Sequence, residues 1–225
     1  VHERSIDSDF LLIILKKMIK KFPKLRIVLM SATIDRKIFD DYFEDKAKKS
    51  IAHVHIEGRT FPIDDYYLGD VFDLTDFKIS PAGSYSHYDD YDDEIVTNKV
   101  RPSTDSKYFQ SGNINYDLIK ELVYKVDEKL KAENDNGSIL IFLPGVMEIK
   151  KCLNGINDHH FWKLPLHSAL SSQEQKRILE KPTANKRKII ASTNIAETSI
   201  TIPDAVVVID TERVKSVQYD SRSNN

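Results

Sequence analysis

The first 63 residues alternate between helical and strand-like spacing of their hydrophobic positions. Between Leu11 and Phe22, apolar residues recur at three- and four-residue steps, and Pro23 ends the pattern, as in an amphipathic helix. The pattern predicts a helix, a strand, a second helix and a second strand, over residues 9–22, 25–30, 34–43 and 51–56. This order indicates right-handed parallel α/β units. Because two strands are too few for such a sheet, we expect the rest of it to precede Val1.

Residues 114–225 show the same alternation more regularly. The predicted helices cover residues 116–130, 146–153 and 172–179, and the predicted strands cover residues 138–143, 162–166, 188–191 and 205–210. Short runs that are apolar throughout are typical of strands buried on both faces of a parallel sheet. The predicted fold class is therefore α/β, with a second doubly wound parallel sheet in this part of the chain.

The stretch between these two parts, residues 64–113, is acidic and has no sustained periodicity in its centre. We predict an inserted or linking loop there. The run YDDYDDE at residues 88–94 raises the alternative of a calcium site. It lacks the glycine and the alternating ligand spacing of a calcium-binding loop, so a solvated acidic loop is the better interpretation.

The formal net charge of -2 depends on that acidic stretch. The chain has 33 basic and 35 acidic residues, but residues 64–94 contain ten of the acids and one base, Lys78. The remainder carries 32 basic and 25 acidic residues, a formal charge of +7. The near-neutral total therefore does not exclude a protein that binds nucleic acid.

Composition and the chain ends set broader limits. Hydrophobic residues make up 40% of the chain, which is enough for a packed core, and no apolar run approaches the length of a membrane helix. The single cysteine, Cys152, excludes an internal disulfide and fits a reducing compartment, the cytoplasm or the nucleus. The chain opens at Val1 without an initiator methionine and ends at Asn225 without a structural stop, so we expect a piece of a longer protein.

Four polar segments directly follow predicted strands. They are Ser-Ala-Thr at residues 31–33, Pro-Gly at 144–145, His-Ser at 167–168 and Ser-Thr-Asn at 192–194. Ligands of open parallel sheets lie beyond the carboxyl ends of the strands. Neutral hydroxyl and amide groups suit phosphate oxygens there, together with free backbone N–H groups at helix starts. The alternative is that these residues only cap helices and turns, but four such segments on the same side of two sheets favour a ligand surface.

A set of motifs in fixed order resembles the DEAH/RHA family of DExH-box ATP-dependent RNA helicases, within helicase superfamily 2. The motifs are VHERS at residues 1–5, SAT at 31–33, ILIFLPG at 139–145, LPLHSAL at 164–170 and STNIAETSITI at 192–202. The last run is highly specific. Residues 58–63 and 214–220 look closest to the branch that contains RNA helicase A.

The resemblance implies a fold and an activity. The fold is a pair of RecA-like parallel sheets, with the C-terminal part of lobe 1 in residues 1–63, the acidic linker in 64–113 and most of lobe 2, the helicase C-terminal domain, in 114–225. The implied parent is an enzyme that uses ATP and Mg²⁺ to translocate along single-stranded RNA and open duplexes. RNA is the implied partner, and no membrane is implied.

The resemblance also assigns site residues one by one. His2 matches the histidine of the Asp-Glu-x-His box, and Ser31 and Thr33 match the residues that couple the γ-phosphate to strand separation. Leu179 matches the nucleotide-base contact, and Asp204 the ribose contact. The implied RNA contacts are Pro144, Gly145, His167, Ser168, Thr193, Asn194, Thr198, Ser199 and Thr201.

Several family features are absent from this sequence. No glycine precedes a lysine, so there is no Walker A loop, and the box acids and the terminal arginine motif belong before Val1 and after Asn225. We therefore expect Mg²⁺ to bind mainly to residues outside this segment, and the chain alone to hydrolyse no ATP. Leu179 stands where the family often has an aromatic residue, which loses π-stacking on the base.

Two other functions stay open at this point. A helicase-like protein can clamp RNA or a partner without turnover, and a different superfamily 2 motor acts on DNA or a viral genome. A metal site is disfavoured, because His53 and His55 share a predicted strand face without a supporting cysteine or carboxylate cluster.

Overall fold

A computed structural model describes most of the chain. The described residues are 6–31, 36–44, 51–58, 61–79, 99–106, 109, 111–183, 186–198, 200–213 and 215. The chain divides into two compact units, Val1–Ile63 and Asp64–Asn225. The acidic run at residues 88–94 lies outside the described residues.

The first unit contains both predicted helices. They are α1 (Ile6–Lys21) and α2 (Arg36–Phe43). The Lys16 ammonium joins them, because it donates to the backbone carbonyl of Tyr42 and lies 4.2 Å from the centroid of the Tyr42 ring. A cation over an aromatic face is attracted by the ring quadrupole.

The two strands predicted in this unit are wrong. Residues 25–30 and 51–56 form no strand in the structure, because neither finds a backbone partner among the described residues. A strand exists only where its N–H and C=O groups pair with a neighbour. Their apolar side chains, such as Met30 at 78% and Val54 at 84%, are exposed rather than covered on both faces.

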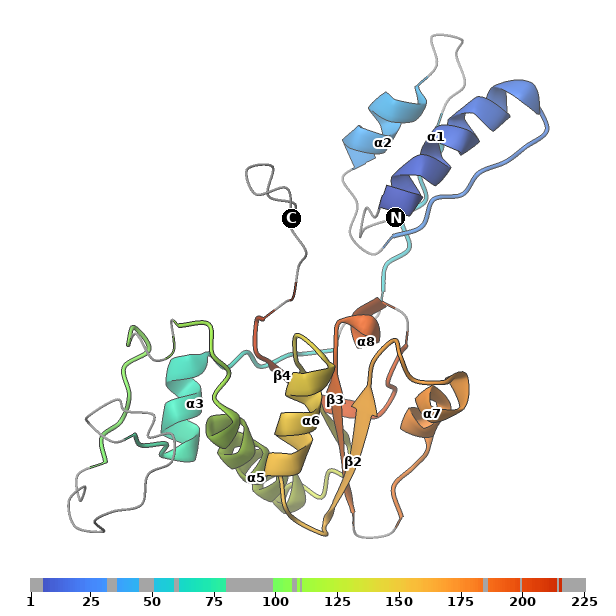
Figure 1. The fold of residues 1–225 in the computed structure, drawn as a ribbon. Coiled ribbons are helices and arrows are strands. Elements are labelled where there is room, and N and C mark those ends of the chain that lie inside the picture. Colours follow the sequence, from blue (N-terminus) through green and yellow to red (C-terminus); the bar gives the residue numbers. More distant parts are fainter. Residues whose placement is uncertain are drawn as a thin grey trace. The chain divides into compact units, whose positions relative to one another are not determined.

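The second unit is built on the parallel sheet that the hydrophobic pattern predicts (Figure 1). Its four strands are β1 (Ser138–Phe142), β2 (Phe161–Leu166), β3 (Arg187–Ser192) and β4 (Ala205–Asp210). They lie in the order β2-β3-β1-β4, and all three pairings are parallel. This architecture confirms the α/β, RecA-like prediction for the second lobe.

Alternation along the strands separates two hydrophobic cores. Ile139 and Ile141 of β1 pack on one face of the sheet, against α5 (Tyr116–Ala132) and α6 (Val146–Gly155). Leu140 faces the opposite way and packs with Ile178 of η1 (Arg177–Leu179), a 3-10 helix that continues α7 (Ser172–Lys176). Side chains with a period of two reach both faces, so each face needs its own helical layer.

Cys152 lies in the first of these cores and is 2% exposed. Burial raises the pKa of its thiol to about 12, because the thiolate loses its hydration there. The side chain therefore acts as a small apolar group.

One helix in the predicted linker was not anticipated. Residues 68–75 form α3 (Leu68–Thr75), and its Phe72 is 1% exposed, with rings of Phe77 and Phe109 beside it. The helix packs against α5 and belongs to the second unit. The helical spacing of its apolar residues covers only two turns, and its exposed face is acidic. This short pattern is therefore hard to recognise within an acidic stretch of sequence.

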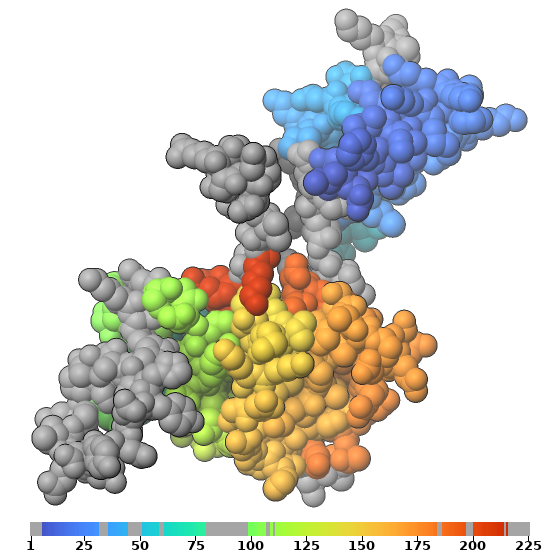
Figure 2. All heavy atoms as spheres, in the orientation of Figure 1, coloured from blue at the N-terminus to red at the C-terminus, as the bar shows by residue number. Residues whose placement is uncertain are grey.

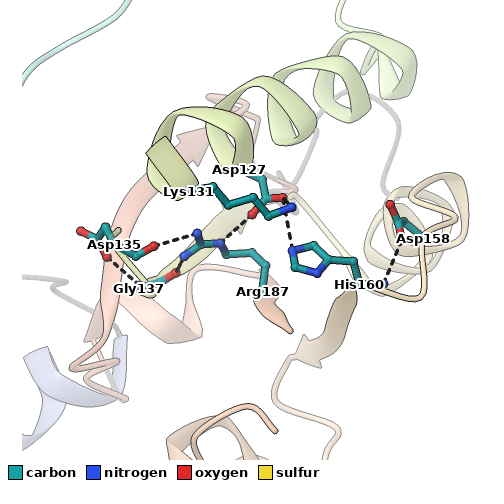
Figure 3. A network of polar contacts seen from close by, with 7 residues as sticks. All are labelled: Asp127, Lys131, Asp135, Gly137, Asp158, His160 and Arg187. Atoms are coloured by element: carbon teal, nitrogen blue, oxygen red, sulfur yellow. Dashed lines mark hydrogen bonds and ion pairs between the residues drawn. The ribbon is translucent and has the colours of Figure 1, made fainter. Parts of the chain in front are cut away.

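A buried ion pair joins α5 to the start of β3 (Figure 3). Arg187 Nε donates to Asp127 Oδ1 at 2.8 Å, and the same guanidinium donates to the carbonyls of Asp135 and Gly137, which precede β1. Lys131 lies 2.8 Å and His160 3.4 Å from the other carboxylate oxygen. Burial raises the pKa of Asp127, but the hydrogen bonds from Arg187 and Lys131 outweigh it and hold that pKa below its usual value.

We predict that Asp127→Asn lowers the free energy of unfolding by about 3–5 kcal/mol, because it leaves the Arg187 charge buried without a counterion. Urea denaturation of the chain measures the change. The control is Glu128→Gln on the same helix, whose carboxylate is 67% exposed and pairs with Lys125. Its cost is below about 1 kcal/mol. Equal costs for the two variants contradict the prediction.

Candidate nucleic-acid interface

Three of the predicted ligand segments meet at the carboxyl edge of the sheet. Backbone hydrogen bonds connect them in sequence across the strands. Leu143 N donates to Ser192 O at 2.8 Å, and Thr193 N donates to Leu166 O at 3.1 Å. The ends of β1, β3 and β2 are therefore held side by side, as parallel strands require. The edge so formed carries six predicted RNA contacts: Pro144, Gly145, His167, Ser168, Thr193 and Asn194.

The loop after β1 leads directly into α6. Gly145 is the residue before the first helical turn, and its carbonyl accepts the first hydrogen bond of the helix, from Ile149 N at 3.0 Å. A Cβ on Gly145 would lie 2.8 Å from Glu148 Oε2 and 2.9 Å from Lys215 Nζ. Glycine therefore leaves the space in which these two charged groups approach the backbone.

Glu148 and Lys215 form an ion pair over this loop that the sequence did not reveal. Lys215 Nζ donates to both carboxylate oxygens, at 2.9 and 2.8 Å. Figure 2 shows the red atoms that follow β4 lying on the yellow atoms at the start of α6. The hydrogen bond from Lys215 holds the pKa of Glu148 below its usual value. The two residues are 67 positions apart, so no local pattern connects them.

The loop after β2 combines an exposed hydroxyl with a buried imidazole nitrogen. Ser168 is exposed, whereas His167 Nδ1 is buried and finds no hydrogen-bond partner in the described part of the chain. Ser171 further along has a structural task, because its hydroxyl accepts from Glu174 N at 3.3 Å and caps α7.

The loop after β3 begins with a hydroxyl that serves the backbone. Ser192 is fully buried, and its Oγ donates to Thr193 O at 2.6 Å. Thr193 is half-buried and Asn194 is exposed, directly before α8 (Ile195–Thr198). Thr201 is exposed on the segment that returns toward β4. Thr211 closes the edge, since its Oγ1 donates to Phe142 O at 2.9 Å, a contact that the sequence analysis missed.

The two predicted nucleotide contacts lie at the opposite, amino edge of the sheet. Asp204 directly precedes β4, and Leu179, which is 54% exposed, ends η1. Both are tied to Lys188, the second residue of β3, whose ammonium lies 2.7 Å from Asp204 Oδ2 and donates to the carbonyls on either side of Leu179. The structure thus brings these two residues together, away from the carboxyl edge.

The remaining predicted site residues are placed in part. Ser31 is half-buried in the first unit. His2, Thr33 and Ser199 lie outside the described residues, and of Thr198 only the backbone is described, at the end of α8.

Comparison with known proteins identifies the domain that contains this sheet. Residues 115–222 match the family described as helicase conserved C-terminal domain. The Saccharomyces cerevisiae protein YLR419W is 48% identical to this chain. The match covers 100% of this chain and 16% of the yeast protein. Residues 115–222 belong to the helicase conserved C-terminal domain family, and the chain has relatives that are named ATP-dependent RNA helicases. Human ATP-dependent RNA helicase DHX29 is 34% identical over 99% of this chain and 19% of its own length.

The helicase relatives are much longer than this chain, which spans less than a fifth of the human and yeast proteins. Among solved structures, the Escherichia coli DEAH/RHA helicase HrpB is 28% identical and covers 50% of this chain and 14% of its own, with a TM-score of 0.41.

None of the helices in the described part of the chain is both long and apolar enough to cross a membrane. No group of three or more histidine, cysteine or acidic side chains lies together as a metal site in the same residues. His53 is instead paired with Asp40, at 3.1 Å.

We predict that Lys215→Met raises the pKa of Glu148 toward its ordinary value, because the hydrogen bond from Lys215 contributes most to the lowering. Carbon-13 NMR titration of the glutamate carboxyl measures it. Lys151→Met is the matched control, since Lys151 acts on Glu148 only through weaker charge attraction. An equal or larger rise in the Lys151→Met variant contradicts the assignment of this ion pair.

Proposed function

We propose that this chain is the segment of an ATP-dependent RNA helicase that holds the RNA backbone with its second lobe. The parent uses ATP and Mg²⁺ to move along single-stranded RNA and to open duplexes. The observation that carries the proposal is the carboxyl edge, where three loops with polar groups are tied side by side in a chain related to proteins named RNA helicases.

The chemistry of this edge suits a sugar–phosphate backbone. Asn194 and Ser168 are exposed and offer neutral amide and hydroxyl donors, while the charge of Lys215 beside Gly145 is balanced by Glu148. Contacts of this kind position a strand without reading its bases, which a motor that moves along any sequence requires. Backbone contacts alone do not separate RNA from DNA unless a 2′-OH is read.

The amino edge suits the nucleotide. Leu179 presents an exposed apolar side chain for a base, and the Asp204 carboxylate is 35% exposed, which leaves lone pairs for a ribose hydroxyl. ATP supplies the free energy for movement through hydrolysis of its γ-phosphate. We assign Mg²⁺ mainly to residues outside this segment, because the pair of box acids that the resemblance implies for it is not among these 225 residues.

Two assays test this proposal. In the intact helicase that carries this chain, ATP hydrolysis is expected to rise with single-stranded RNA more than with single-stranded DNA. The 225-residue chain alone is expected to hydrolyse none, since its sequence has no Walker A loop. RNA binding by the intact protein without ATP turnover would indicate a clamp, and stronger stimulation by DNA would indicate a DNA motor; either result overturns the proposal.

We predict that Thr193→Ala combined with Asn194→Ala weakens RNA binding about tenfold, because each lost neutral hydrogen bond costs about 0.5–1.5 kcal/mol. Fluorescence anisotropy of the chain with several RNA sequences measures this. The loss is expected to be uniform across sequences and to leave the salt dependence unchanged, because neutral groups release no counterions.

The control for this variant is Thr183→Ala, an exposed threonine that precedes β3 at the other edge. Its affinity for RNA is expected to equal that of the unmodified chain. Equal losses in the double variant and in Thr183→Ala contradict the placement of RNA at the carboxyl edge.

A further inference from the structure

Lys188 is a fully buried ammonium with three partners. The residue is 1% exposed, and its Nζ lies 2.8 Å from Ile178 O, 3.0 Å from Glu180 O and 2.7 Å from Asp204 Oδ2. A lysine ammonium has three N–H donors, so all of them are used. A buried charge is tolerated only when it is paired and hydrogen-bonded in this way.

These partners belong to the two segments that carry the proposed nucleotide contacts. Ile178 and Glu180 are the neighbours of Leu179 on either side, so the ammonium holds the backbone at both ends of that residue. Asp204 stands 16 positions later along the chain from Lys188, directly before β4. The side chain of Lys188 therefore bonds to both segments at once.

Hydrogen bonds within the protein use much of the accepting capacity of Asp204. Its backbone carbonyl accepts from Ser138 N at 2.6 Å, and its Oδ1 lies 3.4 Å from Ser138 Oγ. Lys188 occupies Oδ2, so the remaining accepting capacity of the carboxylate, which is 35% exposed, is turned toward solvent. The Leu179 side chain is likewise exposed, whereas its neighbour Ile178 is fully buried.

We infer that Lys188 is a positioning residue for the nucleotide: it sets the spacing and direction of the Leu179 side chain and the Asp204 carboxylate, so that base and ribose are held together. The inference rests on the proposed function, because it needs the nucleotide to bind at this edge. Lys188 does not contact the nucleotide itself, since its three donors are already used.

The neighbouring cation Arg187 has a different task. Its partners are Asp127 and the turn before β1, and none of them carries a proposed ligand contact. Loss of the Arg187 contacts is therefore expected to change stability alone, whereas loss of the Lys188 contacts changes nucleotide affinity as well.

The test is Lys188→Met in the intact helicase that carries this chain. The KM for ATP is expected to rise about tenfold, because displaced contacts lose binding energy, while kcat at saturating ATP and RNA affinity stay within about twofold. A smaller fraction of folded protein would lower the apparent kcat and leave KM unchanged. A rise in KM at constant kcat therefore separates a positioning role from a loss of stability. The matched control is Lys186→Met, whose side chain is exposed two positions earlier and whose KM is expected to be unchanged.

A double-mutant cycle makes the test specific. Leu179→Phe alone is expected to lower the KM for ATP about threefold, since an aromatic ring stacks on the base. In the Lys188→Met background the same change is expected to give no gain, because the backbone that aims residue 179 is no longer fixed. An undiminished gain, or an unchanged KM in Lys188→Met, overturns the inference.

Two further outcomes are decisive. If Lys188→Met does not fold, Lys188→Gln replaces it, since the amide keeps two N–H donors for the carbonyls but leaves Asp204 without its counterion. The same rise in KM supports the inference, and an unchanged KM overturns it.

If the unmodified helicase neither binds nor hydrolyses ATP, the proposed function itself fails. That result is distinct from an active helicase in which substitution of Lys188 leaves the KM for ATP unchanged.

Discussion

Two adjacent buried cations at the start of β3 determine how the second lobe is put together. Arg187 is 4% and Lys188 1% exposed, and neighbouring side chains on a strand point to opposite faces of the sheet. Removing a charge from water costs several kcal/mol unless a counterion and hydrogen bonds replace the water. Each cation therefore needs its own carboxylate and carbonyls, Arg187 from the α5 layer and Lys188 from the η1 layer.

This requirement links elements that apolar packing alone would leave free to slide. Hydrophobic contacts are non-directional, so they hold a helix on a sheet without fixing its register. The fork of Arg187 and the three donors of Lys188 have fixed directions, and their bonds join the start of β3 to α5, to η1 and to the residue before β4. A third cation acts similarly, since Lys163 of β2 donates to Leu153 O and Ile156 O at the end of α6.

Much of this lobe follows from period and composition. The four strands and the helices on either side appear where the apolar runs and the helical spacing predict them, because a fully covered parallel sheet has the strongest sequence signal. The polar loops at the strand ends were also predictable, since topology places carboxyl ends together. The strands predicted in the first unit failed, because an apolar run specifies a strand only when a partner strand is available to pair with it.

What could not be predicted depends on distant partners. The contacts of Lys188 with Asp204 and of Lys215 with Glu148 join positions that no periodicity relates, and an isolated lysine in sequence reads as a solvated side chain. α3 was concealed by its acidic exposed face, although Phe72 is among the most buried residues of the unit. Sequence patterns report what one element does on average, whereas these contacts depend on the pairing of particular atoms.

The placement of charge follows from what each edge has to do. At the amino edge the cations are buried and pair with carboxylates and carbonyls of the protein itself. These interactions hold the edge rigid. At the carboxyl edge the loops are held by backbone bonds, and the exposed groups are mostly neutral. Strand β3, buried at all six positions, joins the two edges within one strand, with Lys188 near its start and Thr193 just after its end. A nucleotide fixed at one edge and an RNA backbone held at the other would therefore be connected through β3, and a strand buried on both faces cannot shift without opening both cores.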